Sequence, residues 1–357
     1  MDRLHIAFFG PANSGKSTLV NALCGQEVSL VSPVPGTTTD PVRKTVELPG
    51  LGACVLIDTA GLDDASLLGP ERRRRTLAVL DETDIAVVLG PSDTPDAPSV
   101  IPDLIGDLPV VVYKRGESIE SLLERLRAVA PKQEERFLTG DLVKAGDCVL
   151  LVMPQDSEAP KGRLILPQVQ VLRELLDRGC NPICCTPESL SSALSKVTPD
   201  LVITDSQVFG LVNRALPPSM PLTSFSVLLA GAKGDIRTFV EGAAAMDKLK
   251  PGDRVLIAEA CTHVPDTEDI GRVKIPALLR KKADIQVDIA AGNDFPEDLS
   301  PYSLIIHCGA CVATRTLVKA RIKKALREGV PITNYGIAIA KLQGILDRIE
   351  IPGRGRE

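Results

Sequence analysis

Two short cysteine and histidine segments near the C-terminal end of the chain carry residue types that bind soft or borderline metals. They are Cys261-Thr262-His263 and His307-Cys308-Gly309-Ala310-Cys311, and they contain two of the three histidines in the chain. Thiolate and imidazole are the protein ligands that zinc and iron–sulfur centres prefer. Independent scatter would rarely bring so few histidines into both cysteine clusters. The two segments therefore predict the two halves of one metal-binding site.

These ligands leave three arrangements open. Cys261, Cys308 and Cys311 with an exchangeable fourth ligand suit a 4Fe-4S cluster, because such clusters are held mainly by thiolates. Zinc would need a closed tetrahedron, which the same cysteines and either His263 or His307 would supply. Thiols at strand ends without any metal are the third arrangement. The remaining cysteines have no histidine nearby and are expected to be small buried residues: Cys24, Cys54, Cys148, Cys180, Cys184 and Cys185.

A second chemical motif lies at the N-terminal end. Residues 10–17 read Gly-Pro-Ala-Asn-Ser-Gly-Lys-Ser, a full match to the P-loop pattern G-x-x-x-x-G-K-S, between an apolar strand and a helix at Thr18–Leu23. In this nucleotide-binding loop, backbone N–H groups wrap the phosphates, the lysine reaches the terminal phosphates and the serine hydroxyl binds Mg²⁺. The predicted nucleotide contacts are Gly10, Asn13, Ser14, Gly15, Lys16, Ser17 and Thr18.

Two further segments indicate the class of P-loop protein. The segment Asp58-Thr59-Ala60-Gly61 follows an apolar strand, and it supplies a carboxylate, Asp58, for the Mg²⁺ shell and a glycine amide, Gly61, that can sense a γ-phosphate. Residues 35–40 contain the expected switch threonine, Thr38, with Thr37 as the alternative. Together these motifs resemble the TrmE–Era group of translation-factor-like GTPases. The resemblance implies GTP with Mg²⁺ as the bound nucleotide.

Two positions bear on the rate of hydrolysis. Leu62 stands where Ras-like proteins carry the glutamine that positions the attacking water, so intrinsic turnover should be slow. In TrmE-like proteins an asparagine of the loop helps to bind K⁺, and Asn13 occupies the matching place. The alternative is that Asn13 only supports the turn, since asparagine is common in turns.

The motif that reads the base departs from the pattern of this group. GTPases of the group read guanine with N-K-x-D at a strand end, and Val112-Tyr113-Lys114-Arg115-Gly116 keeps only the lysine. In a second alignment, residues 114–120 resemble the later S-A-K segment with its following helix, and N-K-x-D is deleted. The guanine carboxylate is missing in both alignments. Discrimination between GTP and ATP should therefore be weak.

The composition favours parallel sheets covered by helices. Apolar residues make up 44% of the 357 residues, aromatic residues only 3%, and Trp is absent. A net charge of -5 gives no basic surface for a polyanion, so nucleic acid is not an expected partner. The chain enters a strand at Leu4–Phe9 without a signal peptide, and no apolar run reaches the ~18 residues that a membrane span needs. We expect a cytoplasmic protein with reduced thiols.

Alternating strands and helices predict three doubly wound α/β units, at 1–131, 137–232 and 233–353. The expected strands are Ile6–Phe9, Cys54–Ile57, Ile85–Leu89 and Val110–Val112, then Cys148–Met153, Pro182–Thr186, Leu201–Thr204 and Leu222–Leu229, then Arg254–Ala258, Ile285–Ile289 and Leu304–His307. The expected helices include Leu166–Leu176, Leu190–Val197, Ile236–Leu249 and Thr314–Glu328. Both cysteine clusters begin where a strand ends, so their halves can converge at the carboxyl edge of one sheet.

Several longer segments carry a family resemblance. They are 162–170 (Gly-Arg-Leu-Ile-Leu-Pro-Gln-Val-Gln), 204–207 (Thr-Asp-Ser-Gln), 258–263 (Ala-Glu-Ala-Cys-Thr-His), 269–276 (Asp-Ile-Gly-Arg-Val-Lys-Ile-Pro), 307–311 (His-Cys-Gly-Ala-Cys) and 331–336 (Pro-Ile-Thr-Asn-Tyr-Gly). The chain resembles the HydF family of FeFe-hydrogenase maturation GTPases over nearly its whole length. The resemblance implies a GTPase domain, a dimerisation domain and a domain with a 4Fe-4S cluster, whose three cysteines are Cys261, Cys308 and Cys311 and whose motif histidines are His263 and His307.

The same resemblance implies a role and partners. Members of the family are scaffolds and carriers for the di-iron precursor of the hydrogenase active site, which they hand on to apo FeFe-hydrogenase, and they act together with radical-SAM maturation enzymes as homodimers or higher homo-oligomers. A zinc-stabilised regulatory NTPase that binds a protein partner without a cluster is the alternative from another class. In a third alternative the G domain binds nucleotide without turnover.

Overall fold

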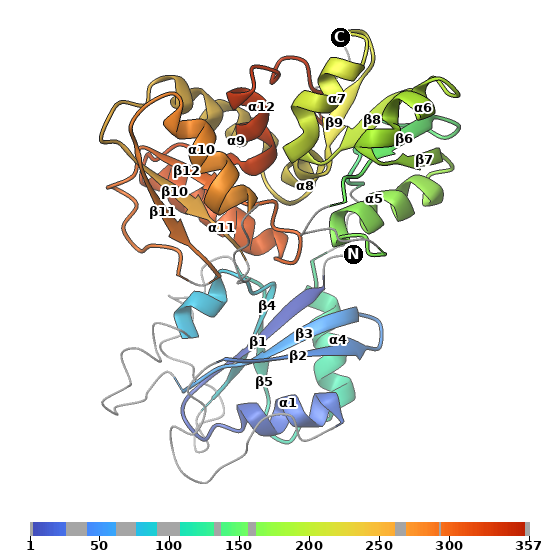
Figure 1. Ribbon diagram of the computed structural model, residues 1–357. Coiled ribbons are helices and arrows are strands. Elements are labelled where there is room, and N and C mark those ends of the chain that lie inside the picture. The colour runs from blue at the N-terminus through green and yellow to red at the C-terminus, as the bar shows by residue number, and fades with distance from the viewer. Residues whose placement is uncertain are drawn as a thin grey trace. The chain divides into compact units, whose positions relative to one another are not determined.

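Within the residues that it describes, the computed structural model contains three β-sheets with the helices that cover them (Figure 1). The chain forms two compact units, one of residues 1–134 with 314–320 and one of residues 135–313 with 321–357. The structure describes residues 3–25, 41–61, 76–90, 108–131, 137–155, 162–260, 269–292 and 294–353.

The first unit is built on a five-stranded sheet of order β2-β3-β1-β4-β5, in which only β2 is antiparallel to its neighbour. The central strand β1 is buried on both faces, with Ile6 and Phe8 in one core cluster and Ala7 and Phe9 in the other. Strand β2 was not predicted, because it is an edge strand whose residues alternate between exposed and half-buried. The elements of the first unit are β1 Leu4–Phe9, α1 Lys16–Cys24, β2 Val42–Leu48, β3 Gly52–Asp58, β4 Ile85–Leu89, β5 Val110–Tyr113 and α4 Ile119–Val129.

The second unit contains two four-stranded parallel sheets, of order β7-β6-β8-β9 and β11-β10-β12-β13. The first sheet and its helices comprise β6 Cys148–Val152, α5 Leu166–Asp177, β7 Asn181–Cys185, η1 Pro187–Ser189, α6 Leu190–Leu194, β8 Leu201–Thr204, η2 Ser206–Val208, α7 Phe209–Ala215, β9 Leu222–Ser224 and α8 Phe225–Lys233. The second comprises α9 Ile236–Ala243, η3 Ala244–Asp247, β10 Arg254–Ala258, η4 Ile270–Lys274, α10 Ile275–Arg280, β11 Gln286–Ala290, β12 Leu304–His307, α11 Arg315–Arg327, β13 Ile332–Asn334 and α12 Tyr335–Leu342.

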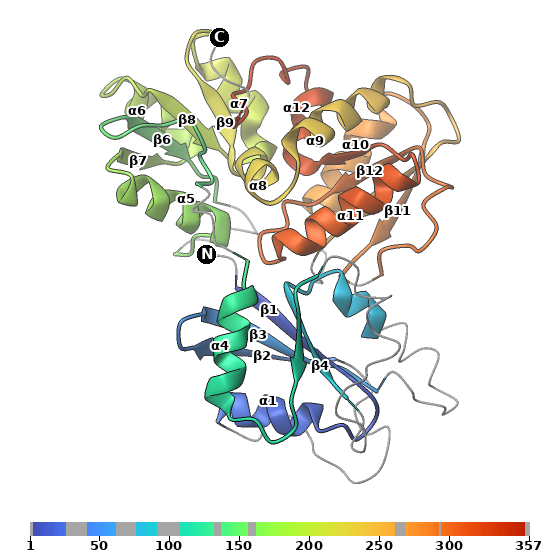
Figure 2. The same ribbon diagram turned by 180° about the vertical axis from the view of Figure 1, so that it is seen from behind.

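The second four-stranded sheet has helices on both faces. Figure 1 shows α10 in front of its strands, and Figure 2, from behind, shows α11 in front of them. This doubly wound α/β arrangement agrees with the fold class predicted from the composition. None of the helices in the described ranges has the length and apolar character that crossing a membrane requires.

One predicted strand was wrong in its second half. Leu222–Leu229 was expected to be a single strand, but β9 ends at Ser224 and α8 begins at Phe225. The side chain of Ser224 caps the new helix by accepting a hydrogen bond from the backbone N–H of Val227. The apolar run is buried in both elements, and a short buried run has no periodicity that separates strand from helix. Similarly, the helix expected at Ile236–Leu249 continues beyond Ala243 only as the 3₁₀ turn η3.

Candidate functional site

The P-loop forms the turn between β1 and α1. Its backbone has positive φ at Asn13 (59°) and at Gly15 (94°), the residue that precedes the helix. The Lys16 side chain is only 6% exposed, and its ammonium donates hydrogen bonds to the backbone carbonyls of Gly10 (3.1 Å) and Pro11 (2.6 Å). The lysine predicted to reach the phosphates therefore points into the loop, where its donors are held by carbonyl oxygens.

The two groups predicted to hold Mg²⁺ lie next to each other. The Ser17 hydroxyl donates to the Oδ2 atom of Asp58 at 2.6 Å, and Asp58 is fully buried at the end of β3. A Cβ atom added to Gly61 would lie 2.6 Å from the backbone nitrogen of Ala12, so the glycine lies directly against the P-loop. This geometry suits an Mg²⁺-bound phosphate. The predicted switch residues Thr37 and Thr38, and also Leu62, lie outside the described residues.

The segment expected to read the base, residues 112–116, begins in the last two residues of β5 and continues beyond the strand. In the sequence, the carboxylate nearest to the position of the missing aspartate is that of Glu117. It accepts hydrogen bonds from the Lys114 backbone N–H (2.8 Å), the Arg125 guanidinium (2.5 Å) and the Ser121 hydroxyl (3.2 Å). These three donors belong to the protein itself, so the Glu117 carboxylate is already occupied. Both alignments of the segment agree with the structure, since Lys114 follows a strand and α4 begins shortly after it.

The strand ends that precede the two cysteine clusters are neighbours. Strands β10 and β12 pair in parallel with Ala258 opposite His307, and Cys308 comes directly after β12. The Cys308 sulfur accepts hydrogen bonds from the backbone N–H groups of Ala260 (3.1 Å) and Ala310 (3.4 Å). Ala260 is the residue before Cys261 in the chain. The thiol of one cluster thus lies beside the segment that leads into the other.

Cys261 and His263 themselves fall outside the described residues. Within the described ranges, no three His, Cys, Asp or Glu side chains come together as a metal site. Of the predicted ligands, the structure therefore places His307, Cys308 and Cys311.

His307 is buried at the end of β12, and both of its ring nitrogens have protein partners. Nδ1 lies 2.8 Å from the Cys308 carbonyl oxygen, which can only accept, so Nδ1 carries the proton. Nε2 lies 3.2 Å from Nη1 of Arg321 and accepts from it. Burial, and next the nearby Arg321 charge, lower the pKa of His307 to about 3. The ring is neutral, and a metal that used Nε2 would have to displace Arg321.

Several polar groups around Cys308 suit a cluster held by thiolates. Hydrogen bonds from two amides favour the thiolate form, and hydrogen bonds to sulfur are a means by which proteins tune iron–sulfur centres. The Tyr335 hydroxyl is buried and has no hydrogen-bond partner among the described residues. Burial raises its pKa well above the ordinary value, and Cys308 and Glu259 are among the nearby groups that contribute. The surroundings of Cys308 therefore fit the cluster that the sequence predicts, in which Cys308 and Cys311 are the expected ligands.

Besides Arg321, sequence reasoning missed two further residues of this site. Tyr335 lies at the start of α12, and Lys233 at the end of α8 donates to the backbone carbonyls of Ala310 (2.8 Å), Cys311 (3.2 Å) and Ala313 (2.8 Å). Neither residue belongs to a cysteine or histidine segment, so only the fold brings them to the site.

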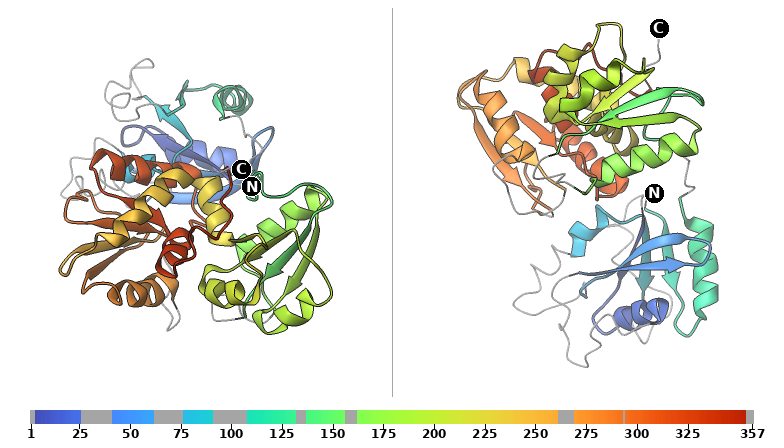
Figure 3. Two further views of the ribbon diagram at one scale, coloured as in Figure 1. Left: turned by 90° about the horizontal axis from the view of Figure 1, so that it is seen from above. Right: turned by 45° about the vertical axis from the view of Figure 1, so that its right-hand side comes forward.

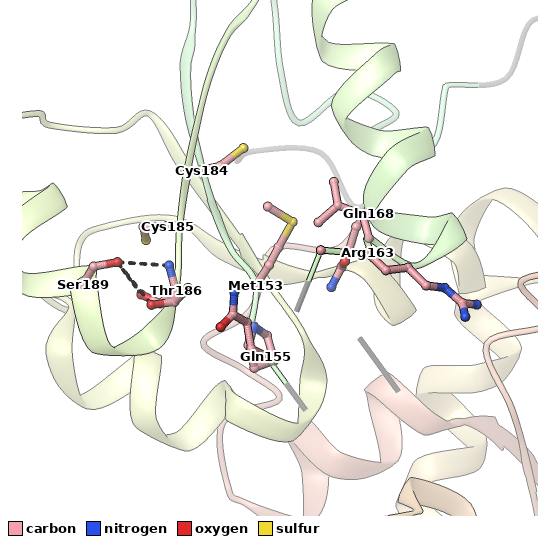
Figure 4. A pocket seen from close by; sticks show the side chains of 11 residues that line it. Met153, Gln155, Arg163, Gln168, Cys184, Cys185, Thr186 and Ser189 are labelled. Carbon is pink, nitrogen blue, oxygen red and sulfur yellow. Dashed lines mark hydrogen bonds between the residues drawn. The ribbon is translucent and has the colours of Figure 1, made fainter. Parts of the chain in front are cut away.

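A pocket lies at the carboxyl edge of the other four-stranded sheet, at the ends of β6 and β7 (Figure 4). It contains Cys184 and Cys185 but no histidine. Cys184 is exposed, which corrects the expectation that it is buried, and burial raises the pKa of Cys185 to about 11. A thiol with that pKa stays protonated at neutral pH when no metal is bound.

Each of the three sheets lies in a segment that matches a known protein family. Residues 138–234 match the Hydrogen maturase F dimerization domain, residues 237–351 match the Hydrogen maturase F tetramerization domain, and residues 5–114 match the 50S ribosome-binding GTPase family. The two Hydrogen maturase F domains together cover more than half of the chain. The chain belongs to the HydF family. The matched domains are named for a GTPase and for the dimerization and tetramerization of Hydrogen maturase F, and the last two names support homo-oligomerisation.

Curated relatives named as GTPases match about a third of this HydF chain. The tRNA modification GTPase MnmE of Xanthomonas oryzae pv. oryzae (strain MAFF 311018) is 42% identical over 110 residues, which are 30% of this chain and 24% of that protein. MnmE of Acidiphilium cryptum (strain JF-5) is 37% identical over 151 residues, which are 37% of this chain and 34% of that protein. The chain thus spans only about a quarter to a third of the length of these relatives.

Solved structures give weaker likenesses. Aquifex aeolicus Era bound to GDP·AlF4⁻ is 17% identical with a TM-score of 0.29, over 83% of this chain and 97% of that one. Toc33 from Arabidopsis thaliana in complex with Mg²⁺ and GMPPNP is 16% identical with a TM-score of 0.23, over 52% of this chain and 71% of that one. At such TM-scores nothing about this chain follows from either structure.

Proposed function

We propose that this HydF chain is a scaffold and carrier that holds a 4Fe-4S cluster and delivers the di-iron precursor of the hydrogenase active site to apo FeFe-hydrogenase. Radical-SAM maturation enzymes are the proposed partners that supply the precursor. The observation that supports this most is the position of Cys308. Its sulfur lies at the carboxyl edge of the second four-stranded sheet and accepts a hydrogen bond from Ala260, the residue before Cys261.

Cys261, Cys308 and Cys311 are the proposed cluster ligands. A cluster held by three thiolates keeps one coordination position that can exchange, which suits a carrier. Of the two motif histidines, His263 is the better candidate for that position, because both ring nitrogens of His307 already have partners. The buried Tyr335 hydroxyl would remain available as a hydrogen-bond donor at the same edge of the sheet.

The G domain is proposed to bind GTP with Mg²⁺ through the P-loop contacts, Thr38, Asp58 and Gly61. The proximity of the Ser17 hydroxyl to Asp58 supports this assignment, because both are hard oxygen ligands that suit Mg²⁺. Hydrolysis is proposed to be slow, with Asn13 helping to bind K⁺, and to act as a conformational or partner-release signal rather than as part of the chemistry at the cysteines.

We propose that each of the three units predicted from the sequence has its own function. They are a GTPase domain at 1–131, a dimerisation domain at 137–232 and a cluster domain at 233–353. The last of these overlaps the family domain named for tetramerisation, at residues 237–351. We infer that cluster binding and self-assembly share this part of the chain.

Metal analysis of anaerobically reconstituted protein tests the proposal. The expected result is about four iron and four sulfide per chain with a brown colour, as a single 4Fe-4S cluster requires. The matched control is Cys184→Ala, a cysteine of the other four-stranded sheet, which should bind the same amount of iron. A colourless protein that binds zinc would contradict the proposal and support the zinc-stabilised regulatory NTPase instead.

A further inference from the structure

The two four-stranded sheets are two copies of one structural unit. Their strand pairings correspond residue by residue. Val152 pairs with Thr204 in the first sheet as Ala258 pairs with His307 in the second. The fourth strands continue the match, since Thr204 lies opposite Ser224 and His307 lies opposite Asn334. The correspondence places Asp205 at the position of Cys308 and Gln155 at the position of Cys261, so the first copy lacks the metal ligands.

The copies contact each other through equivalent helices, α8 and α12, which lie side by side (Figures 1 and 3). Ser226 and Gly336 are the second residues of these helices. The Ser226 hydroxyl donates to Oδ1 of Asn334 at 3.1 Å and accepts from the Gly336 backbone N–H at 3.1 Å. A Cβ atom at Gly336 would lie 2.9 Å from the backbone nitrogen of Val227. Contacts between equivalent positions of two copies indicate that an approximate two-fold axis relates the copies.

This relation directs each helix end toward the other copy. Lys233 is the ninth residue from the start of α8, and Gln343 stands at the ninth position from the start of α12. Lys233 donates to the loop that follows β12 and carries Cys308 and Cys311. The Gln343 side chain lies close to Gly210, just beyond the loop that follows β8. The lysine thus occurs only where the facing loop carries cysteines.

Lys233 is well suited to hold that loop. Its side chain is 5% exposed, and its ammonium has three N–H donors for the carbonyls of Ala310, Cys311 and Ala313. Within the loop, Ala310 has a φ of 52°, a left-handed conformation that is unfavourable for alanine. The same Ala310 donates its N–H to the Cys308 sulfur. A bond that fixes the Ala310 carbonyl therefore also fixes a donor to a proposed ligand.

We propose that Lys233 is a positioning residue for the metal site: the first copy, which carries no ligands, uses it to hold the loop of the second copy in the shape that binds the cluster. The proposal rests on the proposed function for the identity of the ligands. The contact between Lys233 and the loop itself does not depend on a cluster.

The first test uses the apoprotein and follows amide hydrogen exchange of residues 309–314 in Lys233→Met. We expect exchange about tenfold faster than in the wild type, which corresponds to about 1.4 kcal/mol. Gln343→Met, the change at the equivalent position, should leave these amides unchanged. Wild-type exchange in Lys233→Met would overturn the proposal, as would equal acceleration in both variants.

The second test uses the reconstituted full-length protein and measures iron release to a chelator. Lys233→Met should release iron several-fold faster than the wild type and Gln343→Met, whereas equal rates would overturn the proposal. If Lys233→Met fails to fold, Lys233→Gln replaces it, and intermediate rates are expected because glutamine keeps two of the donors. If the wild type binds no iron, the proposed function fails, but hydrogen exchange still decides the role of Lys233.

Discussion

The nucleotide site and the cysteine site of this chain are stabilised in different ways. In the P-loop, the proposed ligand groups bond to other parts of the same site, as Lys16 does to the Gly10 carbonyl and Ser17 to Asp58. The cysteine loop, residues 308–314, has an internal bond from Ala310 to Cys308, but it is also held from outside, by Lys233 of the neighbouring copy. A nucleotide must therefore compete with bonds inside its own site, which suits exchange. The cysteine loop keeps its shape through contacts that the proposed cluster would not need to break, which suits retention of that cluster.

The sites also share one feature. Across the residues that the structure describes, the non-glycine residues with positive φ are Asn13 and Ala310, one in each loop. Such conformations persist only where the surroundings enforce them, and they are frequent at functional sites. In the P-loop the residue is an asparagine, which tolerates this region, whereas in the cysteine loop it is an alanine, which needs more support. That difference agrees with the need for an external lysine.

Removal of a proposed cluster ligand should give the largest effect. Cys308→Ala is expected to abolish stable iron binding, because a cluster with three thiolate ligands cannot spare one, and Cys261→Ala and Cys311→Ala should do the same. Iron and sulfide analysis after anaerobic reconstitution measures this, and the affinity for GTP should stay unchanged. Full iron content in Cys308→Ala would show that other thiols are the ligands.

The next prediction concerns the lysine of the P-loop. Lys16→Ala should weaken Mg²⁺-dependent GTP binding by about a hundredfold or more, since charged hydrogen bonds to phosphate contribute about 3 kcal/mol. Titration calorimetry gives the affinity, and iron content should equal that of the wild type. Loss of the cluster in Lys16→Ala would contradict the separation of the two sites.

The preference for GTP over ATP tests whether the missing guanine carboxylate leaves the base unread. Because the guanine carboxylate is missing, we expect a preference for GTP over ATP well below a thousandfold, or about 4 kcal/mol, in competition binding. Glu117→Gln should leave the ratio unchanged, since its carboxylate is occupied by Lys114, Ser121 and Arg125. A larger preference would mean that another residue reads the base.

The smallest effect is expected at Asn13, where two roles are to be separated. Glycine tolerates the φ of 59°, so Asn13→Gly keeps the turn and removes only the side-chain amide. We expect GTP affinity within about threefold of the wild type, a change below ~1 kcal/mol, together with loss of K⁺-stimulated hydrolysis. Stimulation that persists in Asn13→Gly would leave the turn as the only role of Asn13.

Much of the fold and of each site followed from local patterns. Strands such as Ile85–Leu89 and Leu201–Thr204 were predicted to the residue, because their apolar runs end in clear breaks. The adjacency of the strand ends at Ala258 and His307 followed from the rule that parallel strands place their carboxyl ends at one edge. The GTPase and HydF assignments likewise came from continuous motifs.

What could not be predicted depends on contacts between distant segments. The bond between His307 and Arg321 and the bonds from Lys233 to the cysteine loop join residues without a shared motif. One signal was available: Pro221-Leu222-Thr223-Ser224 and Pro331-Ile332-Thr333-Asn334 both precede a buried helix. A comparison of these two segments would have revealed the repeated unit, and it would have corrected the strand expected at Leu222–Leu229.

The contact between α8 and α12 has a consequence for how the protein responds to dilution. Both helices belong to one polypeptide, so their association is governed by an effective concentration that the connecting segment sets and that does not change with the amount of protein. Lys233 therefore stays on the cysteine loop in the most dilute solution. A lysine supplied by a second subunit would leave the loop whenever the oligomer dissociated.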